Sequence, residues 1–221
     1  MQTNACSSEP VEDPGATVQV AMSHNKRGRN EVPNGDNILQ IVIKMEKDSD
    51  EHAFVCIEAA ILKLLANSNH IPQFFGYGSH KNFKFMSYEL LGPNMIVLDN
   101  YKKPYKFNLH SLLKFGIYAI ETFQIMHIQD FIHRDLKPGN FLIGNTQETF
   151  GKFYVSSFEL NKKINRQHGV VTTQQPTNKG KFRDIMMCTS LNAHTLVEIG
   201  RNDDQISLLY VMVEFNNGML P

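Results

Sequence analysis

The stretch "HRDLKPGN", residues 133–140, determines how the rest of this 221-residue chain is interpreted. It matches the pattern H-R-D-x-x-x-x-N in every specified position, and it adds Lys137 two residues after Asp135. The stretch follows a long amphipathic segment and precedes an apolar hairpin, so a chance match is improbable. We therefore predict a loop that takes part in phosphoryl transfer.

Helix and hairpin signals flank this loop. Upstream, residues 108–128 have helical spacing, and Asn108 is a suitable N-cap. Downstream, the apolar runs "FLIGN" and "KFYVSS" surround the turn-rich "TQETFG", which predicts a hairpin. The expected buried side of the helix consists of Leu109, Leu112, Leu113, Ile117, Ile120, Phe123 and Ile128.

Strands dominate the earlier part of the chain. "ILQIVIKME" (38–46) is β-branched and apolar, which predicts a buried strand, and 71–78 and 82–93 are further candidates. The last of these runs ends in a Gly-Pro break. Strands with one helix come first and helices follow, so the order predicts an α+β protein with two lobes.

One early helix contains an unexpected carboxylate. Residues 51–69 have helical spacing, and Glu58 falls in the same stripe as Phe54, Ile61 and Leu65. A buried carboxylate needs a cation, because leaving it unpaired costs several kcal/mol. The alternative is a half-exposed Glu58 at the edge of the stripe.

Composition excludes several classes of partner. Lys and Arg total 22, as do Asp and Glu, so bulk charge favours neither nucleic acid nor a membrane surface. No apolar run approaches the roughly 20 residues that span a bilayer, and the N-terminus shows no signal-peptide pattern. Three scattered cysteines indicate a reducing intracellular setting, cytoplasmic or nuclear. The histidines form no metal-binding pair.

These motifs resemble those of eukaryotic protein kinases, and within them the casein kinase 1 group and its tau-tubulin kinase branch. "ELLGP" (89–93) is similar to the hinge of that group, and "SLNAH" (190–194) to its replacement for the Ala-Pro-Glu motif. Residues 198–221 resemble the central helix of the branch. The resemblance covers about 38–221 and implies a two-lobed kinase-like fold, with a small β-rich N-lobe carrying one helix.

The resemblance also implies domain boundaries. Residues 1–37 would be a poorly structured segment with a degenerate phosphate loop, 38–92 the N-lobe and hinge, and 93–221 a partial C-lobe. The chain ends at Pro221 directly after the central helix, so we expect a truncated helical lobe. The apolar faces of that helix would then lack part of their cover and could associate with a partner. The residues concerned are Leu208, Tyr210, Val211, Val213 and Phe215.

The resemblance implies a role for each polar side chain of the loop, according to its position in the family motif. Asp135 would accept the proton of the attacking hydroxyl, Lys137 would neutralise charge on the γ-phosphate, and Asn140 would hold Mg²⁺. Asp204 matches an aspartate that supports the loop backbone; a helix-dipole role is the alternative.

Further positions would bind ATP. Lys44 would hold the α- and β-phosphates and pair with Glu58. The backbone at Glu89 and Leu91 would bind adenine, with Tyr88 at the back of the pocket.

Several positions depart from the family. "SFE" (157–159) replaces Asp-Phe-Gly, so Ser157 offers a neutral hydroxyl where a carboxylate should bind Mg²⁺. Glu159 is a possible substitute ligand. The segment 14–22 keeps only a remnant of the glycine-rich loop. Within 182–190, Asp184-Ile185 stands where the family has Gly-Thr, and Met187 stands where it has a basic residue.

Together the departures favour a pseudokinase that binds or scaffolds proteins, with weak or absent nucleotide binding. One alternative is a Ser/Thr protein kinase that uses ATP and Mg²⁺ with Asp135 as base. The other is an incomplete kinase fragment. The partner in each case would be a protein.

Overall fold

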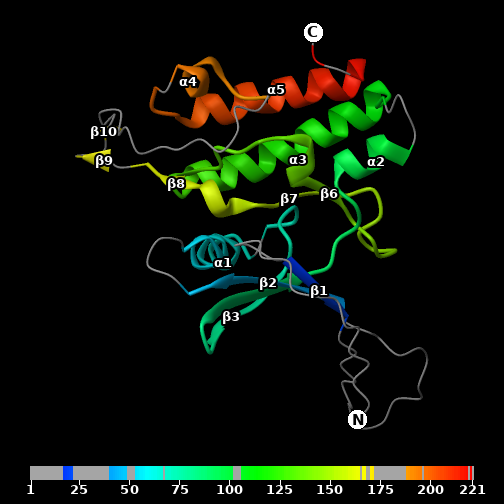
Figure 1. Ribbon diagram of the computed structural model, residues 1–221. Coiled ribbons are helices and arrows are strands. Elements are labelled where there is room, and N and C mark those ends of the chain that lie inside the picture. Colours follow the sequence, from blue (N-terminus) through cyan, green and yellow to red (C-terminus); the bar gives the residue numbers. More distant parts are fainter. Residues whose placement is uncertain are drawn as a thin grey trace.

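The computed structural model describes residues 17–21, 40–48, 53–66, 68–101, 106–164, 166–167, 170–171, 188–195, 197–218 and 220. Their elements divide between a β-rich lobe and a helical lobe, which Figure 1 shows one above the other. The predicted α+β class with two lobes is confirmed.

The β-rich lobe contains a four-stranded antiparallel sheet with the order β1-β2-β4-β3. Its strands are β1 (Thr17–Ala21), β2 (Gln40–Lys47), β3 (Phe74–His80) and β4 (Phe83–Glu89). In this sheet β1 places Thr17 opposite Lys44 of β2. The sheet therefore includes part of the segment 1–37, and the remainder of that segment lies outside the described residues.

Helix α1 (Phe54–Leu64) packs against this sheet (Figure 1). Glu58 lies on its buried face with Val55, Ala59, Ile61 and Leu62, so the half-exposed alternative is wrong. The helix is shorter than the predicted 51–69, because a turn begins at 65 and the following Ser68 and Asn69 favour turns.

Two long helices, side by side, dominate the other lobe (Figure 1). Its helices are α2 (Met95–Tyr101), α3 (Leu109–Ile128), α4 (Leu191–His194) and α5 (Arg201–Asn217). The predicted cap of α3 is confirmed, since the Asn108 side chain accepts a 2.8 Å hydrogen bond from the Ser111 N–H.

The loop 133–140 lies between short strands. After the loop, β6 and β7 form the predicted antiparallel hairpin. The strand β5, which precedes the loop, pairs with β8, which follows the hairpin. The short elements are β5 (Phe131–Ile132), the 3₁₀ turn η1 (Pro138–Asn140), β6 (Phe141–Ile143), β7 (Phe153–Val155), the 3₁₀ turn η2 (Phe158–Leu160), β8 (Lys162–Lys163), β9 (Arg166–Gln167) and β10 (Val170–Val171).

An aromatic cluster joins α3, the hairpin and α5. The Phe115 ring lies 4.8 Å from the Phe141 ring and 5.1 Å from the Phe215 ring, in each case edge to face. Phe153 also contacts it at 5.3 Å. Phe115 is fully buried, so it connects three elements of the helical lobe.

Replacing Phe115 with Ala should lower the free energy of unfolding by about 3–5 kcal/mol, because it leaves a cavity in this cluster. Urea unfolding followed by circular dichroism measures the loss. Phe150→Ala is the matched control: that ring is 85% exposed, so its loss should change stability by less than about 0.5 kcal/mol. Equal effects of the two substitutions would contradict the packing described.

The buried face of α3 differs from the prediction. Leu112 and Phe123 are buried as expected, but five of the seven predicted residues are exposed: Leu109 66%, Leu113 53%, Ile117 55%, Ile120 56% and Ile128 68%. Apolar residues surround this helix on most sides. The lobe packs instead against the face that carries Phe115, Gly116, Ala119 and Met126, where two small residues permit close approach.

The C-terminal helix is better covered than predicted. Leu208, Val211 and Phe215 of α5 are buried, so the expectation that they lack cover is wrong. Val213 is half-buried and Tyr210 remains exposed, as does Leu209 next to it. The helix ends at Asn217, and the capping residue Gly218 has a φ of +81°, the left-handed conformation common at helix C-termini. Among the described residues no helix is long and apolar enough to cross a bilayer.

Candidate active site

Loop 133–140 brings the three predicted catalytic side chains together. Asp135 Oδ2 lies 2.9 Å from Lys137 Nζ and accepts a 3.0 Å hydrogen bond from Asn140 Nδ2. The same amide nitrogen donates to the Asp135 carbonyl at 2.6 Å. Asn140 is buried, whereas Asp135 and Lys137 are partly exposed. The loop therefore presents a carboxylate that can accept a proton beside a cation that can stabilise negative charge.

Asp204, at the start of α5, holds the backbone of this loop through hydrogen bonds. Its Oδ2 accepts from the His133 N–H at 2.9 Å, and its Oδ1 accepts from the Arg134 N–H at 3.0 Å. His127 Nε2 of α3 lies 2.9 Å from the same carboxylate. Asp204 is 1% exposed. The predicted bracing contact is present, and the carboxylate joins α3, α5 and the loop.

His133 is held as a neutral imidazole. Its Nδ1 accepts from the Asp135 N–H at 3.3 Å, so Nε2 carries the proton and donates to the Ser156 carbonyl at 3.1 Å. Burial lowers the pKa of His133 below its ordinary value, although Asp204 and Asp135 oppose that shift. The uncharged ring links the loop to the segment that follows β7.

We expect His133 to make the protein less stable in mild acid. Because its pKa is lower in the folded state, the unfolded chain binds the proton first as pH falls below about 6.5. The free energy of unfolding should fall between pH 7 and 5, by at most about 1.4 kcal/mol per pH unit from this group.

Urea unfolding at several pH values measures that slope. The slope should shrink in His133→Asn and persist in His80→Asn, because His80 is exposed. Identical slopes in wild type and His133→Asn would contradict this assignment.

Lys44 lies between two carboxylates. Its Nζ is 2.7 Å from Glu58 Oε2 and also bonds Glu159 Oε1. The predicted Lys44–Glu58 contact is therefore present, and Glu159 is a second partner from the other lobe. Glu58 Oε1 also accepts from the Phe158 N–H at 3.3 Å. These contacts join β2, α1 and the "SFE" segment.

This cluster carries one more carboxylate than cation. Burial alone would lower the pKa of Lys44, but Glu58 and Glu159 outweigh it and raise that pKa. Burial raises the pKa of Glu58, Lys44 opposes the shift, and Glu159 adds to it. Two carboxylates contact a single ammonium group here, and this surplus of negative charge opposes the approach of a polyphosphate.

The connection between the lobes follows β4. The Glu89 N–H donates a hydrogen bond to the Gln73 carbonyl at 2.9 Å. Its side chain accepts from the Gln73 N–H at 3.1 Å. Leu91 is buried. Burial, with Glu58 adding to it, raises the pKa of Tyr88 to about 12, so this phenol stays neutral beside the Lys44 cluster.

Comparison with known proteins identifies the fold. Residues 15–184, more than half of the chain, match the family of protein tyrosine and serine/threonine kinases. The chain belongs to the protein kinase family. It is also 34% identical over 194 residues to a probable serine/threonine-protein kinase of Dictyostelium discoideum. That match covers 86% of this chain and 39% of the relative, so the chain spans about two fifths of that protein's length.

Active members of the kinase family use ATP and Mg²⁺, and the residues here fit that pair poorly. Beside the loop, Asn140 offers an amide oxygen and Ser157 a hydroxyl, whereas Mg²⁺ prefers carboxylate ligands. Glu159, the nearest carboxylate in sequence, is engaged with Lys44. Among the described residues no group of three or more His, Cys, Asp or Glu side chains could hold a metal.

The backbone conformation at Ser157 would accept the aspartate that the kinase family has at this position. Ser157 has a φ of +65°, in the left-handed region, where Asp and Asn are enriched among non-glycine residues. An aspartate could therefore occupy this position without added backbone strain.

Two contacts of the site were not predicted from the sequence. Glu159 was expected as a substitute metal ligand, and its contact with Lys44 was missed. His127 was missed because a histidine late in a helix has no distinctive signal. Asp184, Ile185 and Met187, which replace the family's Gly-Thr pair and basic residue, lie outside the described part of the chain.

Proposed function

We propose that the chain is a pseudokinase of the casein kinase 1 group, tau-tubulin kinase branch, which acts by binding or scaffolding proteins. The kinase-type loop supports the ancestry, and the hinge-like "ELLGP" and "SLNAH" segments support the branch. The scattered cysteines support an intracellular location, cytoplasmic or nuclear.

The observation that carries the proposal is the contact of Glu159 with Lys44. In our interpretation Glu159 takes the place at Lys44 that an anionic phosphate would need. A nucleotide would have to displace this internal carboxylate and face the surplus charge. Ser157 removes the carboxylate that would bring a compensating Mg²⁺. Each change weakens nucleotide binding, and together they favour a fold without efficient phosphoryl transfer.

The second candidate is an active Ser/Thr protein kinase, and the intact cluster of Asp135, Lys137 and Asn140 favours it. In that case Glu159 would leave Lys44 when ATP binds. It would then hold Mg²⁺ together with Asn140, and the substrate would be a protein hydroxyl.

Thermal unfolding with ATP separates the two candidates. A pseudokinase should show little or no increase in melting temperature with ATP, and the shift should not depend on Mg²⁺. Wild-type protein whose melting temperature rises with ATP only when Mg²⁺ is present would contradict the proposal. Ser157→Asp protein serves as the reference, because its added carboxylate should make any shift Mg²⁺-dependent.

A further inference from the structure

Two groups of polar contacts join the β-rich lobe to the helical lobe. In the first, Lys44 of β2 bonds Glu159 of η2, and Glu58 of α1 accepts from the Phe158 N–H at 3.3 Å. In the second, His70, between α1 and β3, reaches β7 and α3. The lobes are therefore joined by side chains as well as by the chain that connects them.

His70 makes its contacts through both its backbone and its ring. Its carbonyl accepts a 3.0 Å hydrogen bond from the Val155 N–H of β7, and its Nδ1–H donates to the Phe153 carbonyl at 3.2 Å. Nε2 lies 3.3 Å from Glu121 Oε2 of α3, and the ring stacks on Tyr118 with 4.1 Å between centroids. One residue of the β-rich lobe thus engages two elements of the helical lobe.

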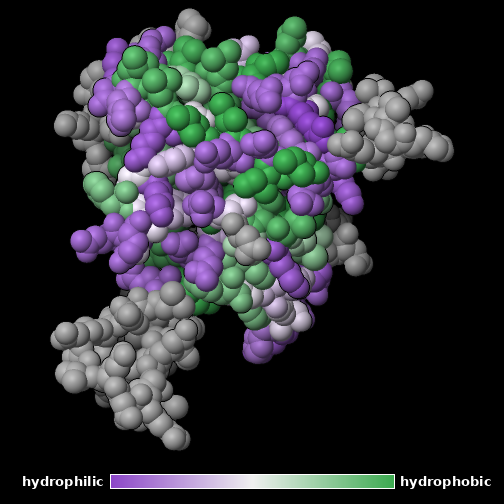
Figure 2. Space-filling model, turned by 180° about the vertical axis from the view of Figure 1, so that it is seen from behind, coloured by the Kyte–Doolittle hydropathy of each residue, from purple (hydrophilic) through white to green (hydrophobic). Residues whose placement is uncertain are grey.

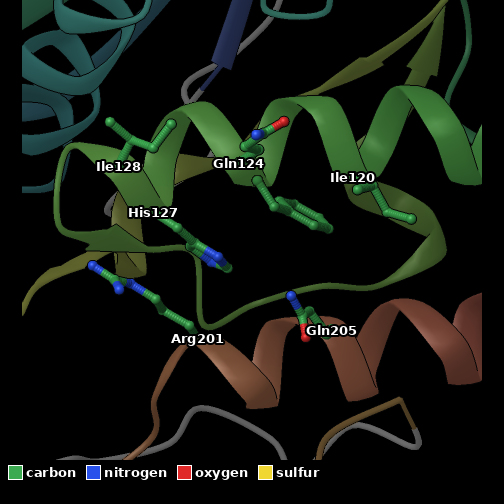
Figure 3. Close-up of a pocket in the computed structure, with 7 residues that line it drawn as sticks. Ile120, Gln124, His127, Ile128, Arg201 and Gln205 are labelled. Atoms are coloured by element: carbon green, nitrogen blue, oxygen red, sulfur yellow. The ribbon is translucent and has the colours of Figure 1, made fainter.

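The helical lobe that receives these contacts is connected internally. His127 of α3 bonds Asp204 of α5, and Arg201 Nη2 of α5 lies 2.6 Å from Oδ1 of Asp130, two residues beyond α3. Figure 3 shows His127 and Arg201 between the two helices. The other lobe is likewise one unit, a continuous sheet with α1 packed on it. Contacts between two such bodies control the angle between them.

We propose that Glu159 holds the two lobes closed in the absence of a nucleotide, with His70 as a second point of attachment. As in the proposed function, on which this step rests, Glu159 occupies the place at Lys44 that a phosphate would take. The Lys44 side chain is only 12% exposed, so water screens its attraction to Glu159 weakly. An internal carboxylate thereby connects β2 to η2 without a ligand.

The connection between the lobes shows which distance would change if they opened. The chain crosses at 90–94, between β4 and α2. Figure 1 shows α1 and α4 towards one side of the molecule and α2 towards the other. Rotation about 90–94 would therefore separate α1 from α4, and it would break the contact of Glu159 with Lys44.

The distance between spin labels on α1 and α4 tests the closure. Cys56 of α1 is exposed and takes one label; Leu191→Cys of α4, at a residue 73% exposed, takes the other. The background carries Cys6→Ser. Cys188 is buried and its pKa is raised to about 12, so it is a poor nucleophile. Without nucleotide, this protein should give one narrow distribution of distances.

Distances between molecules must be kept out of this measurement. Figure 2 shows hydrophobic side chains gathered in patches over the helical half of the molecule, between polar ones. Such patches favour association. Labelled protein is therefore diluted with unlabelled protein, so that the signal reports pairs of labels within one chain.

Two variants should open the lobes and broaden the distribution towards longer distances. Glu159→Gln keeps the length of the side chain and removes the charge that holds Lys44. His70→Phe keeps a ring that can stack on Tyr118 and removes both polar contacts of the imidazole. Lys84→Met is the matched control: it breaks the 2.7 Å ion pair with Asp48 inside the β-rich lobe and should leave the distribution unchanged.

Amide hydrogen exchange measures the same contacts without labels. The Phe158 and Val155 N–H groups both donate across the boundary between the lobes. Glu159→Gln should speed exchange of the Phe158 amide at least about tenfold, and His70→Phe should do so at Val155. The Phe107 amide, which donates to the Phe215 carbonyl within the helical lobe, should exchange at the wild-type rate in both variants.

Two results would overturn the proposal. The first is a broad distribution of distances in the nucleotide-free protein without either substitution. The second is a narrow distribution that Glu159→Gln or His70→Phe retains while circular dichroism shows the variant folded. Both results are obtained without ATP. They are therefore distinct from a failure of the proposed function, which would appear as a Mg²⁺-dependent rise in melting temperature with ATP.

Discussion

The double variant Ser157→Asp/Glu159→Gly is expected to transfer phosphate from ATP at least about 10²-fold faster than the wild-type chain. Removing Glu159 releases Lys44 to bind phosphate and eliminates the surplus negative charge around it. The aspartate adds the carboxylate that Mg²⁺ requires, in a left-handed conformation that aspartate accepts. Initial rates of phosphate incorporation into casein, at fixed Mg²⁺ and ATP, measure the gain.

Single variants separate the two contributions. Glu159→Gln keeps the length of the side chain and removes its charge, so it should raise ATP affinity without making binding depend on Mg²⁺. Ser157→Asp alone should gain less than the double variant, because Glu159 still neutralises Lys44. Adding Asp135→Asn to the double variant should abolish transfer. A double variant no faster than wild type would contradict the assignment of these two residues as the defect.

Asp204→Ala is expected to lower the free energy of unfolding by about 3–5 kcal/mol. It would leave the buried backbone N–H groups of His133 and Arg134 without their acceptor, and His127 without its partner. Arg134 has a φ of +71°, a conformation that persists only where surrounding contacts hold it. Thermal and urea unfolding measure the loss.

Two further variants define this effect. Asn202→Ala, at an exposed position of the same helical turn, should change stability by less than about 0.5 kcal/mol. Asp204→Asn retains an acceptor oxygen and should be intermediate. A loss below about 1 kcal/mol in Asp204→Ala would show that the loop does not depend on this carboxylate.

The sequence predicted those parts of the molecule in which local pattern and tertiary packing agree. The strand β2, the Asn108 cap and the hairpin after the loop have short-range signals, and all are present. For Glu58, the apolar stripe predicted only the need for a cation, and the resemblance to protein kinases implied that this cation is Lys44.

Other features depend on which of several possible contacts forms. α3 is apolar on most sides, so its periodicity could not identify the face that packs, and the small residues Gly116 and Ala119 decided it. The contact of Glu159 with Lys44 joins residues 115 positions apart, and no local pattern specifies it.

Phosphate transfer by the wild-type chain tests the central claim most directly. Purified protein is incubated with labelled ATP, Mg²⁺ and casein, beside Asp135→Asn protein prepared in the same way. We predict equal incorporation in the two samples, at the background level. Incorporation by wild type that Asp135→Asn abolishes would contradict the claim and establish the chain as an active kinase.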